Sequence, residues 1–387
     1  MAYLVGSLLR HRPVSRGRWR PDLPLLSLRA GRSSAREVRE GLVKTSTPAA
    51  PPSARATLKD IARAVGVDVS TVSKVLNNGG ISVRAQTRQA ILDEAGRVNY
   101  RPHALARNLR TQRTGALGIL LPDLTNPVYA ETVRGAMRQA EKAGYVMLIA
   151  EVADEQRSTA AYLRLVSERR IDGLIIAVTA ESREMIEAIA NNPVPHVFVN
   201  RRSTIGRSVT VDDHASGRLA ARTLIEAGHT RLGFIGSMPE LDTSRRRHIG
   251  FVETCKAAGL GPAIVANAPV SRRGGYDALH HIMSEPAPPT GIFAFNMLVG
   301  IGALAAARVR GIQVPRDLSV VSLDGEDAIF TAPPLTAIVT PLSEMGARAV
   351  VELDAMIHGR EPQDVVIDIA PQLVTRESVG PPPKIKS

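Results

Sequence analysis

The sequence contains almost no cysteine and few aromatic residues, and each shortage excludes a class of structure. Cys255 is the single cysteine among 387 residues, so the chain can form no internal disulfide and no cysteine-based metal cluster. This usage fits a reducing cytoplasm. Aromatic residues make up only 3% of the chain, which argues against an aromatic surface for single-stranded nucleic acid. No apolar run approaches the roughly 20 residues of a membrane span, so we expect a cytoplasmic protein without a membrane partner.

Acidic residues are scarce in the first third of the chain, and this sets the distribution of its net charge of +12. Basic residues outnumber acidic ones by eight in residues 1–56 and by six in residues 57–116. In the rest of the chain acidic residues outnumber basic ones by two. A basic module on a near-neutral body predicts a phosphate-binding head attached to a sensing or catalytic domain.

Residues 1–54 show no sustained hydrophobic periodicity and are rich in Arg, Ser and Pro. Such a composition cannot bury a core and predicts a disordered extension. An Arg- and Ser-rich leader with few acidic residues also resembles an organellar transit peptide. A third interpretation is that this segment is translated from sequence upstream of the true start. Val43 is then a candidate for the true first residue.

Residues 55–101 carry the pattern of a small helical domain. Thr57–Asp60 form a capping-box pattern, and the apolar residues that follow have the spacing of one helix face. After Gly66-Val67, a second helix is expected over Val69–Asn77 and a third from about Ala85 to Ala95. Two short helices joined by a glycine-containing turn predict a helix-turn-helix, although an ordinary helical hairpin would give the same pattern.

The second of these helices has an outward face suited to the major groove. Lys74 can reach the O6 and N7 atoms of guanine, Ser70 can donate or accept a hydrogen bond, and Val69 can contact a thymine methyl group. Thr71 and Ser73 complete this small polar face.

From Ala116 onward, apolar runs alternate with helical stretches. The strand-like runs are Leu117–Leu121, Val146–Ala150, Leu174–Val178, His196–Val199, Arg231–Ile235, Gly291–Phe295 and Ser319–Leu323. The helical stretches include Val128–Ala143, Ala215–Ala227, Arg245–Ala258 and Gly300–Val309. This alternation predicts an α/β core, residues 114–380, with parallel sheets covered on both faces. So many units indicate two Rossmann-like subdomains with a cleft between them, followed by a tail at 381–387.

Several motifs occur in an order typical of one family. They are Thr57–Ala62, Gly66-Val67, Ser70–Asn77, Asn99–Pro102, Ala104–Arg110, Pro122–Pro127, Arg170–Ile175, Gly228-His229 and Pro315–Val321. On these residues the chain resembles the LacI/GalR repressors from residue 57 to about residue 378. The resemblance implies a sequence-specific regulator, typically a repressor, whose operator affinity is controlled by a small-molecule effector. An effector-independent regulator and a sugar-binding protein without a regulatory role are the alternatives.

The resemblance also assigns roles in the headpiece. Val69, Ser70 and Lys74 occupy base-reading positions. The positions that contact the DNA backbone are those of Thr57, Thr71, Asn77, Thr87 and Tyr100. The sequence departs from the family in two places: the loop at 78–82 is about one residue longer than the family pattern, and Arg84 stands where a helix-capping Ser is usual.

Residues 102–113 connect the headpiece to the core. Pro102 fixes φ for a helix start, and the helical stretch His103–Arg110 is too short to be stable alone. A flexible linker is one interpretation. The resemblance implies instead a hinge helix that orders on DNA, with Ala106, Arg107 and Leu109 in contact with the operator and Leu109 wedged into the minor groove.

The core resembles periplasmic sugar-binding proteins, whose two lobes close around a ligand. Effector-binding positions carry over by motif to Val128, Tyr129, Asn200, Arg201, Arg247, Asn296, Met297 and Asp324. Arg247 matches the ligand-gripping arginine, since a guanidinium can hold two hydroxyls or a carboxylate; the alternative is a surface cation in an arginine cluster. Most relatives have an Asp where this chain has Met297, so we expect a less hydroxylated ligand than a hexose, or none.

Two other classes of function fit the sequence less well. For an enzyme, we find no nucleophile–His–acid set, no complete phosphate loop and no metal-ligand pair at helical spacing, so neither a cofactor nor a metal is expected. An exported binding protein would need an apolar signal peptide and no headpiece. Because one short recognition helix reads few bases, we expect a homodimer on a near-palindromic operator. No leucine-heptad tail follows Thr375, which favours a dimer over a tetramer.

Overall fold

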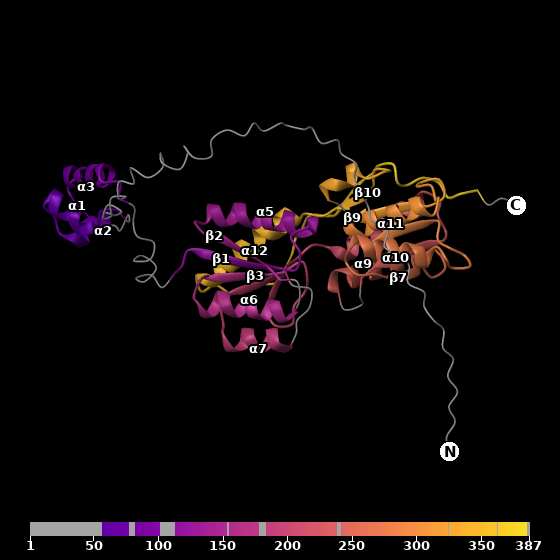
Figure 1. The fold of residues 1–387 in the computed structure, drawn as a ribbon, viewed down its shortest axis with the longest axis horizontal. Coiled ribbons are helices and arrows are strands. Elements are labelled where there is room, and N and C mark those ends of the chain that lie inside the picture. Colours follow the sequence, from indigo (N-terminus) through magenta and orange to yellow (C-terminus); the bar gives the residue numbers. More distant parts are fainter. Residues whose placement is uncertain are drawn as a thin grey trace, which may run out of the picture. The chain divides into compact units, whose positions relative to one another are not determined.

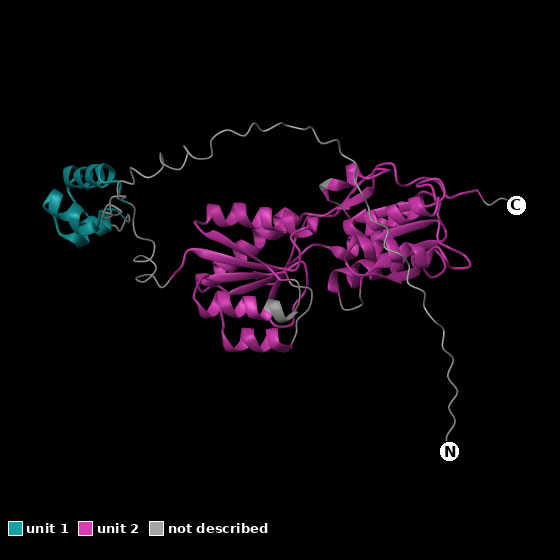
Figure 2. Cartoon of the chain, viewed as in Figure 1, with its two compact units in different colours: residues 1–101 teal, residues 102–387 magenta. Residues whose placement is uncertain are grey.

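The computed structural model describes residues 56–76, 82–100, 113–152, 155–177, 183–237, 241–323, 325–361 and 363–384, without the side chains of residues 155–158 and 326. The chain divides into two compact units, residues 1–101 and 102–387 (Figure 2). The predicted leader and most of the predicted hinge lie outside the described residues. So do five expected site residues: Asn77, Ala106, Arg107, Leu109 and Asp324.

The headpiece consists of three helices around a small apolar core (Figure 1). They are α1 (Leu58–Val65), α2 (Val69–Leu76) and α3 (Ala85–Arg97). The amide and hydroxyl of Thr57 donate to the Asp60 carboxylate at 2.9 and 2.7 Å, which fixes the start of α1. Gly66, with φ of 72°, ends α1, and α2 begins three residues later. The predicted third helix extends two residues further than expected, to Arg97.

The core contains two lobes, each built on a six-stranded sheet. The N-terminal lobe has the order β11-β5-β4-β3-β1-β2, and the C-terminal lobe has the order β12-β10-β9-β8-β6-β7. The first sheet comprises β1 (Ala116–Leu121), β2 (Val146–Glu151), β3 (Gly173–Ile176), β4 (His196–Val199), β5 (Arg207–Thr210) and β11 (Val365–Val366). The second comprises β6 (Leu232–Gly236), β7 (Ile264–Asn267), β8 (Gly291–Ala294), β9 (Ser319–Leu323), β10 (Thr336–Val339) and β12 (Gln372–Val374).

Helices cover both faces of each sheet, as the alternation of strands and helices predicts (Figure 1). In the N-terminal lobe they are α5 (Pro127–Lys142), α6 (Glu155–Ser167), α7 (Arg183–Asn191) and α12 (Leu342–Ile357). In the C-terminal lobe they are α8 (Asp213–Glu226), α9 (Asp242–Ala257), α10 (Arg272–Ile282), α11 (Met297–Val309) and the short 3-10 helix η1 (Glu326–Phe330). All the strand pairings are parallel except that of β10 with β12.

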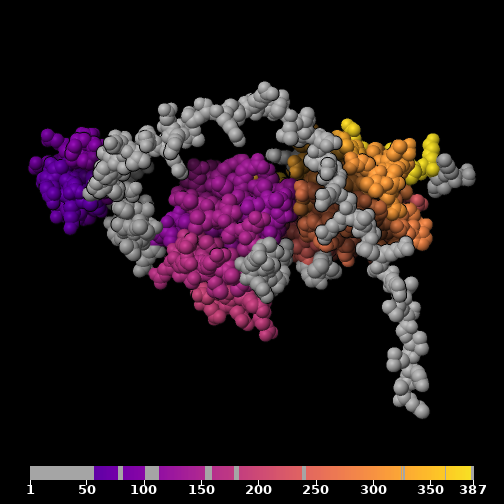
Figure 3. Space-filling view, in the orientation of Figure 1, coloured from indigo at the N-terminus to yellow at the C-terminus, as the bar shows by residue number. Residues whose placement is uncertain are grey.

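Burial on both faces explains why the central strands are continuous apolar runs. Along β1, Leu117 and Ile119 pack into the cluster under α5 and α12, whereas Leu120 packs into the cluster under α6 and α7. Successive side chains of a strand point to opposite faces, so a strand between two helical layers needs apolar residues at every position. Figure 3 shows the two lobes of the core in magenta and orange.

The chain crosses between the lobes three times. It passes from β5 to α8, from β10 to α12, and from β11 to β12. As a result α8 packs in the C-terminal lobe although it follows an N-terminal strand, and α12 packs in the N-terminal lobe although it follows a C-terminal strand. Each lobe is therefore completed by a helix that enters from the other.

The entering helix makes direct backbone contact with its neighbour in both lobes. A Cβ atom at Gly346 of α12 would overlap the carbonyl oxygen of Thr132 on α5, and one at Gly135 of α5 would overlap that of Ser343 on α12. Small residues at both crossing points thus allow the two helix backbones to touch.

The same arrangement recurs between α8 and α9 of the C-terminal lobe. A Cβ atom at Gly217 would overlap the carbonyl oxygen of Arg247, and one at Gly250 would overlap that of His214. Gly217 and Gly346 are both four residues into their helices, and Gly250 and Gly135 are both eight residues in. The two lobes are therefore equivalent in sheet order and also in this helix crossing.

Replacement of Gly346 by Ala should force α12 away from α5. Overpacking a tight contact typically costs about 1–3 kcal/mol, and a backbone contact gives little room to relax. We expect Gly346→Ala to lower the free energy of unfolding in urea by at least this amount. Gly261→Ala is the control, because a Cβ atom there meets nothing within 4 Å. Equal stability of the two variants would show that the crossing is not tight.

Candidate functional site

The outward face of α2 carries the predicted base-reading residues. Ser70 and Lys74 are exposed and Val69 is half-buried, whereas Val72 and Val75 are at most 2% exposed and point into the headpiece core. The Asp68 carboxylate accepts the Ser70 amide at 2.8 Å at the start of the helix. Hydrogen bonds from the Ser70 side chain and amide hold the pKa of Asp68 below its usual range. Ser70 and Lys74 therefore lie exposed on the outward face of a short helix whose valines pack against the core.

The other described headpiece candidates lie around α2. Thr57 is exposed at the start of α1, and Thr71 and Thr87 are half-buried on α2 and α3. Tyr100 is half-buried and packs against the headpiece core, and burial raises its pKa. Arg84 stands at the N-cap of α3 without a side-chain cap, so the departure from the family pattern leaves this helix start uncapped.

A pocket of about 140 Å³ lies between the two lobes of the core. It brings together five of the residues expected to bind the effector: Val128, Tyr129, Asn200, Arg247 and Asn296. Pro122, Asp123, Asn126, Leu241, Thr243, Val270 and Phe295 also line it. The first three of these follow β1, and Phe295 follows β8, so the pocket lies at the carboxyl ends of parallel strands, where ligands bind in α/β sheets.

The N-terminal wall of the pocket is formed by the start of α5 and the end of β4. The Asn126 side chain caps α5 by accepting the Val128 amide at 3.3 Å. Tyr129, 7% exposed, follows in the first turn; burial raises its pKa to about 12, so its hydroxyl stays protonated at neutral pH. Asn200 has φ of 64°, a conformation that suits Asn among non-glycine residues and ends β4 abruptly at the pocket.

Arg247 is the central side chain of the C-terminal wall. The residue is 2% exposed, and its guanidinium contacts Asp213 through Nε and Nη2, both at 2.7 Å. Nη1 donates to the carbonyl oxygen of Phe295 at 2.8 Å, and the guanidinium carbon lies 5.9 Å from the Phe295 ring centroid. These contacts use three of the five N–H groups of an arginine and leave two for a ligand. Arg247 is therefore buried and paired, not a surface cation.

The structure differs from the sequence-based expectation at Met297 and Arg201. Neither side chain lines the pocket. Asn296 caps α11 by accepting the Val299 amide at 2.9 Å, and the next residue, Met297, turns into the C-terminal core, where it is 2% exposed. The Met297 thioether therefore does not face the pocket, contrary to the prediction. The argument against hydroxylated ligands depended on that prediction and is withdrawn with it.

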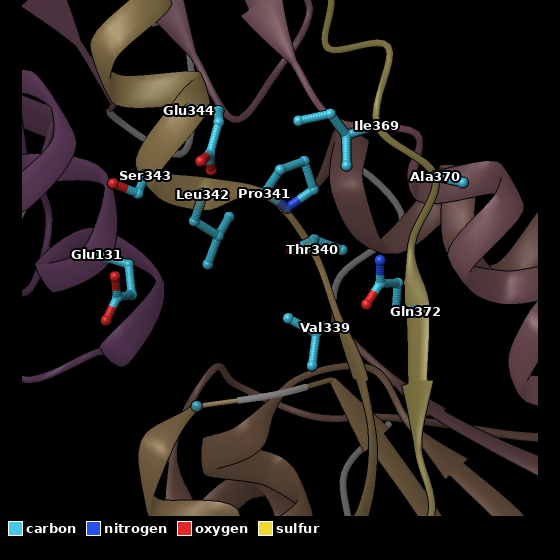
Figure 4. Close-up of a pocket in the computed structure, with 11 residues that line it drawn as sticks. Glu131, Val339, Thr340, Pro341, Leu342, Ser343, Glu344, Ile369, Ala370 and Gln372 are labelled. Atoms are coloured by element: carbon cyan, nitrogen blue, oxygen red, sulfur yellow. The ribbon is translucent and has the colours of Figure 1, made fainter.

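A larger pocket of about 370 Å³ lies along two of the connections between the lobes (Figure 4). Figure 4 shows Thr340 and Pro341 on the strand-to-helix connection, with Ile369 and Ala370 on the neighbouring crossover. Glu131 of α5 also lines this pocket. Because its walls are mostly these connections, the pocket lies where the two lobes join, and no sequence motif indicated it.

The described residues contain neither a candidate metal site nor a candidate membrane-spanning helix. No group of three or more His, Cys, Asp or Glu side chains there is placed to hold a metal ion. Within the same part of the chain, no helix combines the length and apolarity needed to cross a bilayer.

Each of the two units contains a match to a protein family model. Residues 57–103 match the family model of bacterial regulatory proteins of the lacI family, and residues 221–379 match the periplasmic binding protein-like domain. The transcriptional regulator DegA of Bacillus subtilis is 30% identical over 335 residues, which cover 84% of this chain and 99% of DegA. The ribose operon repressor of Escherichia coli K12 is 33% identical over 312 residues, 78% of this chain and 92% of the repressor.

Solved structures show the same relationship. A LacI family regulator from Mycobacterium smegmatis is 31% identical, with a TM-score of 0.63, and the match covers 69% of this chain and 99% of that one. The lac repressor dimer bound to operator and the anti-inducer ONPF has a TM-score of 0.74 at 23% identity, over 84% and 100% of the two chains, which shows a shared fold. With its helix-turn-helix headpiece and two-lobed core, the chain belongs to the LacI family and is a transcription regulator.

Proposed function

We propose that this protein represses transcription by binding an operator as a homodimer, and that a small molecule in the pocket between the core lobes controls its affinity. The observation that carries the proposal is a DNA-reading headpiece joined to a core whose strand ends form a polar pocket around Arg247. Such a regulator acts on genomic DNA, so we place it in the cytoplasm. We propose no catalytic activity.

The DNA interface combines base contacts with backbone contacts. Val69, Ser70 and Lys74 are the proposed base readers on α2, with Thr57, Thr71, Thr87 and Tyr100 on the phosphates. Asn77, Ala106, Arg107 and Leu109 extend the proposed interface by resemblance alone, because they lie outside the described residues. The excess of basic residues before residue 117 supports this assignment, because phosphate contacts dominate affinity for DNA.

The proposed effector is a sugar or a related small metabolite. The pocket offers two N–H groups of Arg247, the protonated hydroxyl of Tyr129 and the carboxylate of Asp123. A ligand that carries several oxygen atoms satisfies donors and acceptors of this kind together. CelR, a structural neighbour with 25% identity and a TM-score of 0.65 over 84% of this chain and all of its own, was solved as a cellobiose complex.

One experiment tests the function as a whole. Genomic fragments bound by the purified protein would be identified, and metabolites of the pathways encoded nearby would be screened for release or tightening of the complex in a gel shift. The proposal expects a discrete set of sites and at least one responsive metabolite. Uniform binding to all fragments would contradict it.

Replacement of Lys74 by Ala should relax sequence preference. Loss of a lysine contact to a base edge costs about 1–3 kcal/mol at one base pair, with a smaller effect on random DNA. Competition gel shifts with single-base operator variants would measure this. Lys59→Ala is the control, since Lys59 is an exposed lysine on α1, outside the reading helix. If both variants lose affinity equally for operator and random DNA, Lys74 contacts only phosphate.

Replacement of Arg247 by Lys should abolish the response to the effector. A lysine keeps a positive charge beside buried Asp213 but cannot donate to the ligand, to Asp213 and to the Phe295 carbonyl from one planar fork. We expect operator affinity without effector to stay within a few-fold of the parent. Arg245→Lys, on the exposed neighbour, provides the control. A parent-like response in Arg247→Lys would remove Arg247 from the effector site.

The homodimer predicts a two-fold operator. Each recognition helix reads one half-site, so scrambling one half of the operator should weaken binding by about tenfold or more, because each mismatched base pair typically costs 1–3 kcal/mol. Light scattering of the protein–operator complex should give two chains per duplex. A single chain on the operator, or a stable tetramer, would contradict the dimer.

A further inference from the structure

Four buried charged side chains form a chain of contacts behind the pocket. Asp242, Arg246 and Arg247 lie on α9 and Asp213 begins α8, and none is more than 9% exposed. Arg246 contacts Asp242 through Nε at 3.0 Å and Asp213 through Nη2 at 2.6 Å. Asp213 in turn holds Arg247 at 2.7 Å. Two carboxylates and two guanidiniums thus neutralise one another within the protein.

Each end of this chain reaches one wall of the pocket. Arg247 lines the C-terminal wall. At the other end, Asp242 accepts the backbone amide of Arg202 at 3.0 Å, and Arg202 follows Asn200 of the N-terminal wall by two residues. Arg246 adds a second link between the lobes, because its Nη1 donates to the carbonyl oxygen of Val211 at 3.2 Å.

The two links start from N-terminal-lobe backbone and end on one helix of the C-terminal lobe. Val211 packs in the N-terminal core directly after β5, and Arg202 lies in the loop between β4 and β5. Burial by itself raises the pKa of Asp242, but the Arg202 amide and the guanidiniums of Arg246 and Arg245 outweigh it, so its pKa lies below the usual range. The carboxylate therefore stays charged at neutral pH, and the links persist.

We propose that Arg246 is a positioning residue for effector sensing, which sets how far the lobes open and couples Arg247 to the N-terminal wall. The proposal rests on the proposed function of the pocket. Opening the lobes separates Arg202 and Val211 from α9 and leaves buried charged groups short of partners, which is costly in a low-dielectric interior. A ligand that displaces Arg247 also acts on Asp213, which both arginines contact. Through Asp213 and Arg246 it changes how far the lobes open.

The opening can be measured without effector or DNA. Labels would be placed on cysteines introduced at Glu187 of α7 and His281 of α10, one exposed position in each lobe. The native thiol of Cys255 is buried and its pKa is raised to about 11, so it stays unlabelled. Labelled chains would be diluted with unlabelled full-length chain, so that distances between the labels report on single chains.

Arg246→Met should broaden the distance distribution and shift its mean to longer distances, whereas the parent should show one narrow population. Arg245→Met is the matched control. It removes a neighbouring arginine that also pairs with Asp242 at 3.0 Å and whose side chain is 62% exposed. Among the described residues, Arg245 makes no hydrogen bond or ion pair with the N-terminal lobe. Circular dichroism and a cooperative thermal transition would establish that each variant is folded.

An unchanged distribution in folded Arg246→Met, or an equal shift in Arg245→Met, would overturn the proposal. If Arg246→Met does not fold, Asp242→Asn decides, because an amide keeps an acceptor for Arg202 but loses the charge that holds Arg246. That variant should shift the distribution in the same direction, and a parent-like distribution would reject the coupling. A failed operator or metabolite screen would refute the proposed function without altering these distances.

Discussion

The backbone contact between each entering helix and its neighbour is the constraint on which the core depends. Glycines at equivalent positions, Gly346 with Gly135 and Gly217 with Gly250, let the crossing helices touch in both lobes. A helix held this closely cannot drift along its partner, because interiors are packed without slack. The crossovers that deliver these helices are therefore anchored on both sides, and lobe motion is confined to the connections between them.

The same crossing places the polar groups of the pocket. Gly217 lets α8 lie directly against the carbonyl oxygen of Arg247 on α9, which brings the first residue of α8, Asp213, beside two arginines of α9. A bulkier side chain at the crossing would separate these buried charges, and unpaired buried charges are far more costly than paired ones. Packing that looks purely structural thus fixes the electrostatics of the site.

The sequence predicted the long apolar strands well, including the edge strand β2, and missed the short or polar ones, including the buried strands β5 and β10. Strands β1, β6, β8 and β9 are apolar runs between two helical layers, and their positions were correct to within a residue or two. Strand β5 reads Arg-Ser-Val-Thr and β7 and β12 lie at sheet edges, so their patterns are too polar or too short to stand out. Helix α10 begins Arg-Arg-Gly-Gly, where the two glycines look like a loop but Gly275 serves a close contact with Val299 on α11.

Individual side-chain directions were the hardest to predict, and the pocket shows why. Asn296 and Met297 are neighbours in a motif, but one caps α11 at the pocket and the next turns into the core, since successive residues differ by about 100° around a helix.

The partners of Arg247 were equally hidden, because Asp213 is 34 residues away and lies beside it only through the helix crossing. That partner changes what the pocket selects. With Asp213 at 2.7 Å, the positive charge of Arg247 is largely neutralised from behind, so an anionic ligand gains little over a neutral one. The two remaining N–H groups still need acceptors in their plane. We therefore propose that this pocket selects its effector by the placement of oxygen atoms more than by charge.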